Sequence, residues 1–313
     1  MPAITATAPG KIILFGEHAV VYGHPAIAVP LQQVFARAVV IPEPRLPSGT
    51  VHIQAPDIAL DATLADLPAN HPLAIAIQGV LAVLQIETPP ALTLRVTSTI
   101  PLAAGLGSGA AVSVAIIRAL SLFFGRPFPD ERISALAYEV EKLHHGTPSG
   151  IDNSVISYNR PVYFVHGQEI EVFRVARPFT LVIGDTGVKS PTAVAVGEVR
   201  QLWQADPVHY EALFNAVGGI TMTARILIEG GQPLELGALM DENHSYLQQM
   251  GVSSPELDCL VEAARTAGAL GAKLSGGGRG GNMIALVKPE LAVKVAAALQ
   301  QAGAVRILTT VVR

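Results

Sequence analysis

The sequence contains one cysteine, few aromatic residues and few charged residues. Cys259 stands alone among 313 residues, so no intrachain disulfide can form, which favours a reducing compartment. Aromatic residues make up only 5% of the chain, and the formal net charge is −4. These two values argue against an aromatic platform for nucleic-acid bases and against a basic footprint for phosphate backbones. We therefore expect no nucleic-acid partner.

Targeting and membrane segments are also missing from the pattern. The N-terminus has no basic region followed by an apolar core, so we expect no secretory signal and a cytoplasmic location. The longest uncharged stretch, residues 96–117, is long enough to span a bilayer, but it contains Pro101 and three glycines. We interpret it as a strand, a loop and the start of a buried helix, and we expect no membrane partner.

Half of the residues are hydrophobic, which is enough for a large folded core. The length favours two domains, and we place the boundary near Pro178, giving residues 1–178 and 179–313. The pattern predicts an α+β class with largely antiparallel sheets. Segments with strand periodicity or strand composition are 4–16 (as strand, turn, strand), 24–31, 34–42, 50–56, 91–101, 161–175 (as a hairpin), 180–186, 272–278, 282–287 and 304–312. Segments with helical patterns are 71–87, 110–124, 129–146, much of the chain from the end of the strand 180–186 to about Ala267, and 289–303.

The stretch PLAAGLGSGAA, Pro101–Ala111, places three glycines between a predicted strand and an apolar helix. Backbone N–H groups at a helix N-terminus, cleared of side chains, form a general site for phosphate. A tight packing turn is the simpler alternative. A Walker loop is excluded because no lysine opens the helix, and residues 105–110 match a dinucleotide fingerprint without the acidic residue that it needs. A phosphate-binding loop of another kind remains.

Two carboxylates could serve such a loop. Asp152 follows the turn in GTPSGIDN, and Glu141 borders the apolar stripe of the preceding predicted helix. Their simpler interpretations are a cap and a solvated helix face. With a nucleotide bound, one could hold Mg²⁺ while the other orients a hydroxyl, which is the division of labour in phosphoryl transfer.

Two further segments carry chemistry. Between two predicted strands, KLSGGGRGGN has five glycines, more than a hairpin needs, which suggests that its backbone packs against a ligand or another domain. Near the start, Lys11, Glu17 and His18 flank an apolar strand. They could be ordinary surface residues or the polar lining of a site.

In this order the four segments resemble the GHMP kinases, and within that family most closely the mevalonate kinases. The matching stretches are APGKIILFGEHAVVYGHPAIA, PLAAGLGSGAA, GTPSGIDN and AKLSGGGRGGN. The resemblance implies a two-domain α+β fold with the active site in the interdomain cleft. It also implies ATP-dependent, Mg²⁺-assisted phosphorylation of the C5 hydroxyl of (R)-mevalonate to 5-phosphomevalonate, in isoprenoid precursor biosynthesis.

The resemblance also assigns roles to residues. Asp152 is the expected catalytic base and Lys11 its cationic neighbour, and both belong to the substrate site with Glu17, His18 and Thr192. Glu141 is the expected Mg²⁺ ligand, with Ser108 as a second candidate. The residues expected to bind ATP are Pro101, Leu102, Ala103, Ala104, Gly105, Leu106, Gly107, Ser108, Gly109, Ala110 and Ala111.

This sequence departs from the family pattern at two positions. Gly109 stands where a second serine usually ligates Mg²⁺, and Arg279 stands where glycine is usual. Alternatives stay open at this point: phosphomevalonate kinase, mevalonate 3-kinase, or a non-catalytic sensor with the same fold. A sensor should lack Asp152 or Lys11, so the presence of both favours an enzyme. The sequence does not show the oligomeric state, and a homodimer stays open.

Overall fold

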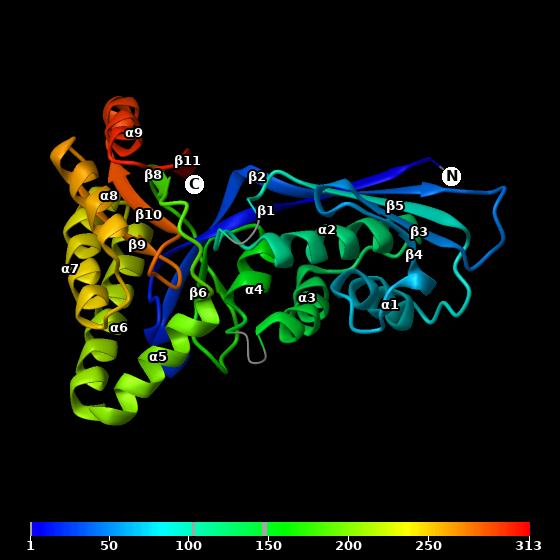
Figure 1. Cartoon of the computed structure of the whole chain (residues 1–313), viewed down its shortest axis with the longest axis horizontal. Coiled ribbons are helices and arrows are strands. Elements are labelled where there is room, and N and C mark those ends of the chain that lie inside the picture. Colours follow the sequence, from blue (N-terminus) through cyan, green and yellow to red (C-terminus); the bar gives the residue numbers. More distant parts are fainter. Residues whose placement is uncertain (1, 102–103, 146–148) are drawn as a thin grey trace. The chain divides into compact units, whose positions relative to one another are not determined.

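The computed structural model describes residues 2–101, 104–145 and 149–313 (Figure 1). The chain divides into two compact units. The first unit comprises Met1–Gly10, Val34–Leu102 and Gly107–Asn159, and the second comprises Lys11–Gln33, Ala103–Leu106 and Arg160–Arg313. Both units mix helices and strands, so the α+β class is confirmed. The domain boundary expected near Pro178 stays a prediction.

Two long strands contribute residues to both units. β1 runs over Ile4–Phe15 and β2 over Ala26–Pro42, and each is one strand where the sequence predicts two. The expected turn at Pro9 is absent. Among the described strands β1 pairs only with β2, so one of its edges forms no ladder. Proline, which has no N–H to donate, is tolerated at such an edge.

The sheet around β2 is antiparallel apart from one parallel pair. Its order is β4-β3-β5-β2-β6-β7, with β1 also paired to β2, and β3 and β5 are the parallel neighbours. β5 alternates largely as predicted, with Leu92, Leu94 and Val96 buried. The remaining strands of this sheet are β3 (Val51–Ala55), β4 (Leu60–Thr63), β5 (Leu92–Ser98), β6 (Val162–Phe164) and β7 (Glu171–Val172), the last two forming the predicted hairpin.

Four helices pack against one another in the first unit (Figure 1). They are α1 (Pro72–Leu84), α2 (Ser108–Phe123), α3 (Asp130–His145) and α4 (Ile151–Tyr158). Eleven of the 16 residues of α2 are buried, as its apolar sequence predicts for a central helix. In α3 the predicted apolar stripe holds at Ile133, Ala137 and Val140, but Leu143 is 44% exposed.

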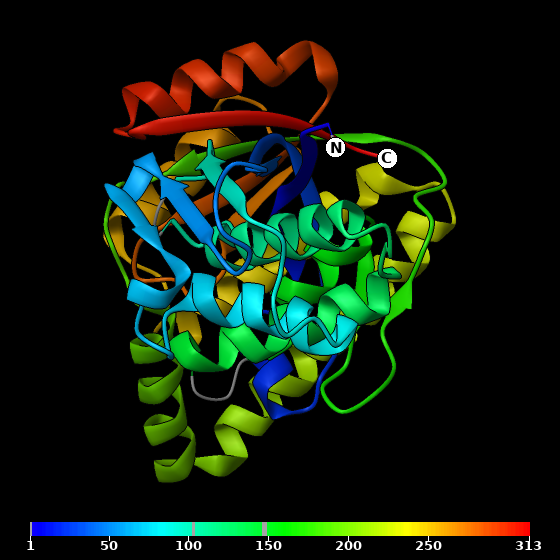
Figure 2. The same ribbon diagram turned by 90° about the vertical axis from the view of Figure 1, so that its right-hand side faces the viewer.

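The second unit contains a four-stranded antiparallel sheet in the order β11-β8-β10-β9. Figure 2 shows α9 lying along β11. The strands are β8 (Phe179–Asp185), β9 (Gly271–Ser275), β10 (Asn282–Val287) and β11 (Arg306–Val312), and the helices are α5 (Thr192–Ala205), α6 (Pro207–Glu229), α7 (Leu236–Gln249), α8 (Pro255–Thr266) and α9 (Ala292–Gln301). Short 3₁₀ turns occupy Ala19–Tyr22, Pro56–Ile58, Leu64–Asp66, Pro233–Glu235 and Pro289–Leu291.

One helix, α6, has the length and composition of a membrane span among the residues described. Its most apolar window is 44% buried within the protein, and the buried face includes Leu213, Phe214 and Val217. Core helices with such a face pass the same test. The stretch 96–117 is divided among the end of β5, the glycine loop and the start of α2, as predicted.

Candidate active site

The glycine loop enters α2 through two left-handed residues. Gly105 has φ 73° and Gly107 has φ 75°, and Gly107 is the N-cap of the helix. Only glycine adopts these values without strain. Backbone N–H groups at such a helix start form a concavity for anions. Pro101 precedes the loop and Ala110 and Ala111 are buried in α2, while Leu102 and Ala103 lie outside the described residues.

The first half of the loop is held by two hydrogen bonds inside the second unit. The backbone N–H of Lys11 donates to the carbonyl of Leu106 at 3.0 Å. The Nδ2 group of Asn282 donates to the carbonyl of Ala104. The sequence alone does not predict a role for Asn282, because nothing local links it to a loop 178 positions away.

The second half of the loop faces Glu141 within the first unit. Glu141 is 5% exposed, so its interpretation as a solvated helix face is wrong. A Cβ atom added at Gly109 would lie 3.3 Å from Glu141 Oε1. Glu141 and the neighbouring Ser108 therefore offer a carboxylate and a hydroxyl near one helix start, the hard oxygen donors that Mg²⁺ prefers. Among the described residues, no group of three or more His, Cys, Asp and Glu side chains could hold a metal.

Asp152 lies in the first turn of α4, one residue after the helix begins. The N-cap is Gly150, with φ 89°, so the interpretation of Asp152 as a cap is wrong. Its neighbours fix this turn: Asn153 Nδ2 donates to Ser134 Oγ of α3 at 2.9 Å, and Ser154 Oγ donates to Gly150 O. The partial positive charge of a helix start favours a carboxylate there. Gly146, Thr147 and Pro148 of the same motif lie outside the described residues.

Arg118 connects the helix that carries the glycine loop to the helix that carries Asp152. From α2, its guanidinium donates to Ser157 O in α4, to Thr7 O in β1 at 3.2 Å and to Asp130 Oδ1 in α3 at 3.2 Å. One cation thus satisfies oxygens of three other elements in the first unit. Sequence reasoning missed it because Arg118 looks like a single charge in an apolar helix.

In the second unit, Glu17 forms a buried ion pair with Lys273 of β9. Burial raises the pKa of the Glu17 carboxyl, while the positive charges of Lys273 and, less strongly, Lys11 oppose this change. Lys273 also donates to Leu274 O at 2.6 Å. Glu17 Oε2 is buried and has no hydrogen-bond partner among the described residues. It is an acceptor available to a ligand.

His18 lies beside this pair in an unusual conformation, with φ 60°. Its Nε2 is 2.9 Å from Gly277 O, so this nitrogen carries the proton and donates, because a carbonyl only accepts. Burial lowers the pKa of His18 to about 4, which keeps the ring neutral near pH 7. Its Nδ1 is then a buried acceptor without a partner among the described residues.

Gly277 is in contact with both His18 and Thr192. A Cβ atom at Gly277 would lie 3.1 Å from Thr192 Oγ1, so the start of α5 packs directly on this glycine. His18 and Thr192, 174 positions apart in the sequence, therefore contact the same backbone unit. Thr192 itself is exposed.

The other glycines of KLSGGGRGGN are explained in part by packing within the second unit. A Cβ atom would lie 2.0 Å from Val252 O at Gly278 and 2.5 Å from Val188 O at Gly280. Arg279, between them, has φ 58° and forms an ion pair with Glu198 of α5. Its Nε also donates to Gly251 O at 3.3 Å. A left-handed backbone of this kind favours glycine, so Arg279 occupies a position that a glycine would fill without strain.

The predicted residues thus fall into two groups. Ser108, Gly109, Glu141 and Asp152 belong to the first unit, and Lys11, Glu17, His18 and Thr192 belong to the second. Lys11 is 5% exposed. The part of the glycine loop from Ala104 to Leu106 belongs to the same unit as Lys11. In the first group the structure brings Gly109 and Glu141 together, and in the second it brings His18 and Thr192 onto Gly277.

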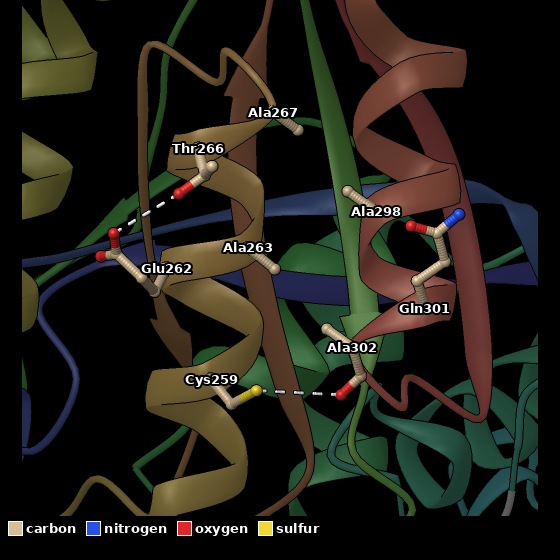
Figure 3. A pocket seen from close by; sticks show the side chains of 8 residues that line it. All are labelled: Cys259, Glu262, Ala263, Thr266, Ala267, Ala298, Gln301 and Ala302. Carbon is tan, nitrogen blue, oxygen red and sulfur yellow. Dashed lines mark hydrogen bonds between the residues drawn. The ribbon is translucent and has the colours of Figure 1, made fainter.

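A separate groove of about 530 Å³ lies between α8 and α9 (Figure 3). Small residues such as Ala263, Ala267 and Ala298 line it, and Cys259 contacts Ala302 O at 3.9 Å at one end. None of the predicted site residues lines this groove.

Two family models match the chain. The model of the GHMP kinases N terminal domain matches residues 74–160, and the model described as GHMP kinases C terminal matches residues 224–305. Together they cover the glycine loop, Glu141 and Asp152 in one segment and the C-terminal glycine run in the other.

Similar proteins extend this match over nearly the whole chain. The mevalonate kinase of Thermococcus sibiricus is 36% identical over 99% of this chain and 96% of the relative. That of Methanothermobacter thermautotrophicus is 35% identical over 90% of this chain and 89% of the relative. The crystal structure of L. major mevalonate kinase in complex with R-mevalonate superposes with a TM-score of 0.82 at 31% identity, covering 99% of this chain and 95% of that one.

Proposed function

The chain belongs to the GHMP kinase family, and from its similarity to mevalonate kinases over nearly its whole length we infer that it is an ATP-dependent kinase of (R)-mevalonate. The 36% identity over 99% of the chain is the observation that carries this conclusion. The product is 5-phosphomevalonate, an intermediate of isoprenoid precursor synthesis.

In the reaction, the C5 hydroxyl oxygen forms a bond to the γ-phosphorus of ATP. The bond between that phosphorus and the β–γ bridging oxygen breaks, and ADP leaves with the electron pair. The hydroxyl proton passes to Asp152, whose carboxylate is oriented by the fixed first turn of α4. Placement of the nucleophile in line with the leaving group supplies much of the rate enhancement.

The glycine loop binds the triphosphate through backbone N–H groups at the start of α2. Lys11 adds positive charge that offsets the charge of the phosphates. Glu141, with Ser108 as a second ligand, would hold Mg²⁺, which would neutralise part of the phosphate charge. The buried carboxylate facing Gly109 supports this assignment.

Glu17, His18 and Thr192 form the mevalonate site. Two buried acceptors, Glu17 Oε2 and His18 Nδ1, are available to hydrogen-bond donors of a ligand. The hydroxyl groups of mevalonate are such donors, whereas its carboxylate is not. The pair therefore recognises the alcohol functions of the substrate. Residues 1–178 supply the nucleotide site and residues 179–313 complete the substrate site in this proposal.

A coupled assay of ADP release tests the function. Purified protein with ATP and Mg²⁺ receives mevalonate, 5-phosphomevalonate, galactose or homoserine in separate reactions. We expect turnover with mevalonate alone, and phosphorus NMR of the product distinguishes 5-phosphomevalonate from a 3-phosphate. Turnover with 5-phosphomevalonate instead, or ATP binding without turnover, would refute the proposal. Gel filtration with light scattering measures the oligomeric state and decides whether the protein is a homodimer.

A further inference from the structure

Two polar residues stand opposite each other at one end of the second sheet. Asn282 begins β10, and its register partner in β9 is Ser275. Both are buried, and both bind backbone carbonyls outside the sheet. Ser275 Oγ donates to Ile13 O of β1 at 2.7 Å, and Asn282 Nδ2 donates to Ala104 O in the glycine loop. This end of the sheet therefore holds both β1 and the loop.

β1 supplies the next contact on the same loop. The Lys11 N–H donates to Leu106 O at 3.0 Å, two residues after the carbonyl that Asn282 holds. In a planar trans peptide the C=O and the following N–H point in opposite directions. Because the Ala104 and Leu106 carbonyls point to Asn282 and Lys11, the N–H groups of Gly105 and Gly107 point away from these two partners.

We propose that Asn282 is a positioning residue for the triphosphate of ATP, acting through the Ala104 carbonyl and the N–H groups of the glycine loop. The left-handed Gly105 and Gly107 supply the required backbone, but glycine alone leaves the loop many conformations. The buried amide selects the one in which the Gly105 and Gly107 N–H groups point away from Asn282 and Lys11. Asn282 Nδ2 would be 3.8 Å from a Cβ atom at Gly105, so it is packed on the loop itself.

The inference rests on the proposed kinase function, and its test separates nucleotide binding from turnover. The variants are Asn282→Ala, which removes the donor, and Asn282→Asp, which keeps the side-chain volume but places an acceptor against Ala104 O. ADP affinity is measured by isothermal titration, and the KM values for ATP and mevalonate and the melting temperature are measured in parallel.

We expect Asn282→Ala to weaken ADP and to raise the KM for ATP up to about tenfold, the size of one positioning hydrogen bond. Asn282→Asp should weaken ADP further, because its carboxylate repels the Ala104 carbonyl that Asn282 holds and so displaces the loop. The KM for mevalonate should change less than about twofold in both variants, since neither change touches the substrate site.

Thr221→Val is the matched control. Thr221 is fully buried in α6 of the same unit, and its Oγ1 donates to Val217 O at 2.8 Å. We expect this variant to lower the melting temperature without changing ADP affinity. Unchanged ADP affinity in folded Asn282→Asp, or equal increases in both KM values, would overturn the proposal. If the wild-type protein does not turn over mevalonate but the Asn282 variants still bind ADP more weakly than it does, the role of Asn282 is upheld and the kinase function is refuted.

Discussion

The helical turn that carries Asp152 is held in place by the two residues that follow it. Asn153 binds α3 and Ser154 binds Gly150, so the first turn of α4 is fixed around a carboxylate that no sequence pattern could orient. The motif predicted the residue because an acid after a glycine turn suits phosphoryl transfer. It could not predict the contact with Ser134, which depends on how α3 packs.

Asp152→Asn should lower kcat by about 10²–10⁴ and leave the affinity for ATP and mevalonate within a few-fold, because the amide keeps the shape but cannot take the proton. Steady-state kinetics and nucleotide titration measure both effects. Glu256→Gln, which removes an exposed carboxylate from the first turn of α8, is the control and should leave kcat unchanged. A kcat above half of the wild-type value would remove Asp152 from the reaction.

Arg279 permits a test of backbone strain. Its φ of 58° costs a residue with a Cβ atom about 1 kcal/mol relative to glycine. The half-exposed ion pair with Glu198 offsets only part of this. We expect Arg279→Gly to be more stable than Arg279→Ala by about 1 kcal/mol in urea unfolding. Equal free energies of unfolding for the two variants would show that position 279 relaxes to a negative φ.

At the scale of elements, the predicted breaks in two strands have a physical meaning. The turn expected at Pro9 and Gly10 and the break expected at Gln32 and Gln33 both fall inside continuous strands. They coincide with the points where β1 and β2 pass from one compact unit to the other. The residues that cover each strand change there, so the hydrophobic pattern changes although the strand continues.

Lys273 shows why part of the site could not be predicted. A lysine in a short strand suggests a solvent-facing position, yet Lys273 has no exposed surface and pairs with Glu17, 256 positions away. Asn282 and Arg118 are similar cases. Motifs identify residues whose neighbours in sequence carry the signal, whereas these three depend on contacts between distant segments.

The contact between α2 and α3 yields a prediction about Mg²⁺. Glu141→Gln should raise the Mg²⁺ concentration for half-maximal rate at least about tenfold, because it removes a charged oxygen ligand. Gly109→Ser should lower that concentration or leave it unchanged, since the new side chain would meet Glu141 Oε1. Titrations of Mg²⁺ at saturating ATP measure both values.

Glu139→Gln on the same helix is the control for this titration. Glu139 is mostly exposed and pairs with Lys142 at 2.7 Å, so its loss should not change the Mg²⁺ requirement. If Ser108→Ala raises the requirement as much as Glu141→Gln does, Ser108 is an equal ligand. A flat response to Glu141→Gln would exclude Glu141 from the metal site.

For the whole molecule, two buried histidines make stability depend on acidity. Burial lowers the pKa of His18 and of His244 to about 4 each, whereas an unfolded histidine titrates near 6.5. As the pH falls from 7 to 5, the unfolded chain gains protons that the folded chain does not. Each histidine therefore contributes its full share to the free energy of unfolding above pH 6.5, and this contribution is lost as the pH falls towards 4. Between pH 7 and 5 the loss is about 2 kcal/mol per histidine.

His18→Asn isolates one of the two contributions. Asparagine tolerates a positive φ, and its amide can donate to a carbonyl as His18 does. Urea unfolding at pH 7 and pH 5 should show a smaller loss of free energy in this variant, by about 2 kcal/mol. The same loss in both proteins would mean that His18 is not the titrating group.

The chain should not divide into two independently folding halves. Lys11–Gln33 belongs to the unit formed mainly by Arg160–Arg313, although the first unit lies between them in sequence. We expect a chain ending at residue 160 to be cleaved rapidly by trypsin at Lys11, which is buried in the full protein. Protection of Lys11 in that fragment would show that the first segment folds without the last.

This interleaving sets a schedule for synthesis in the cell. A ribosome releases Lys11–Gln33 at the start and the segment that buries it at the end, roughly 10–60 s later at ordinary elongation rates. During that interval the apolar halves of β1 and β2 can pair only with each other, and their uncovered faces are surfaces to which a chaperone would bind. The residues made first therefore wait longest for the segment that buries them.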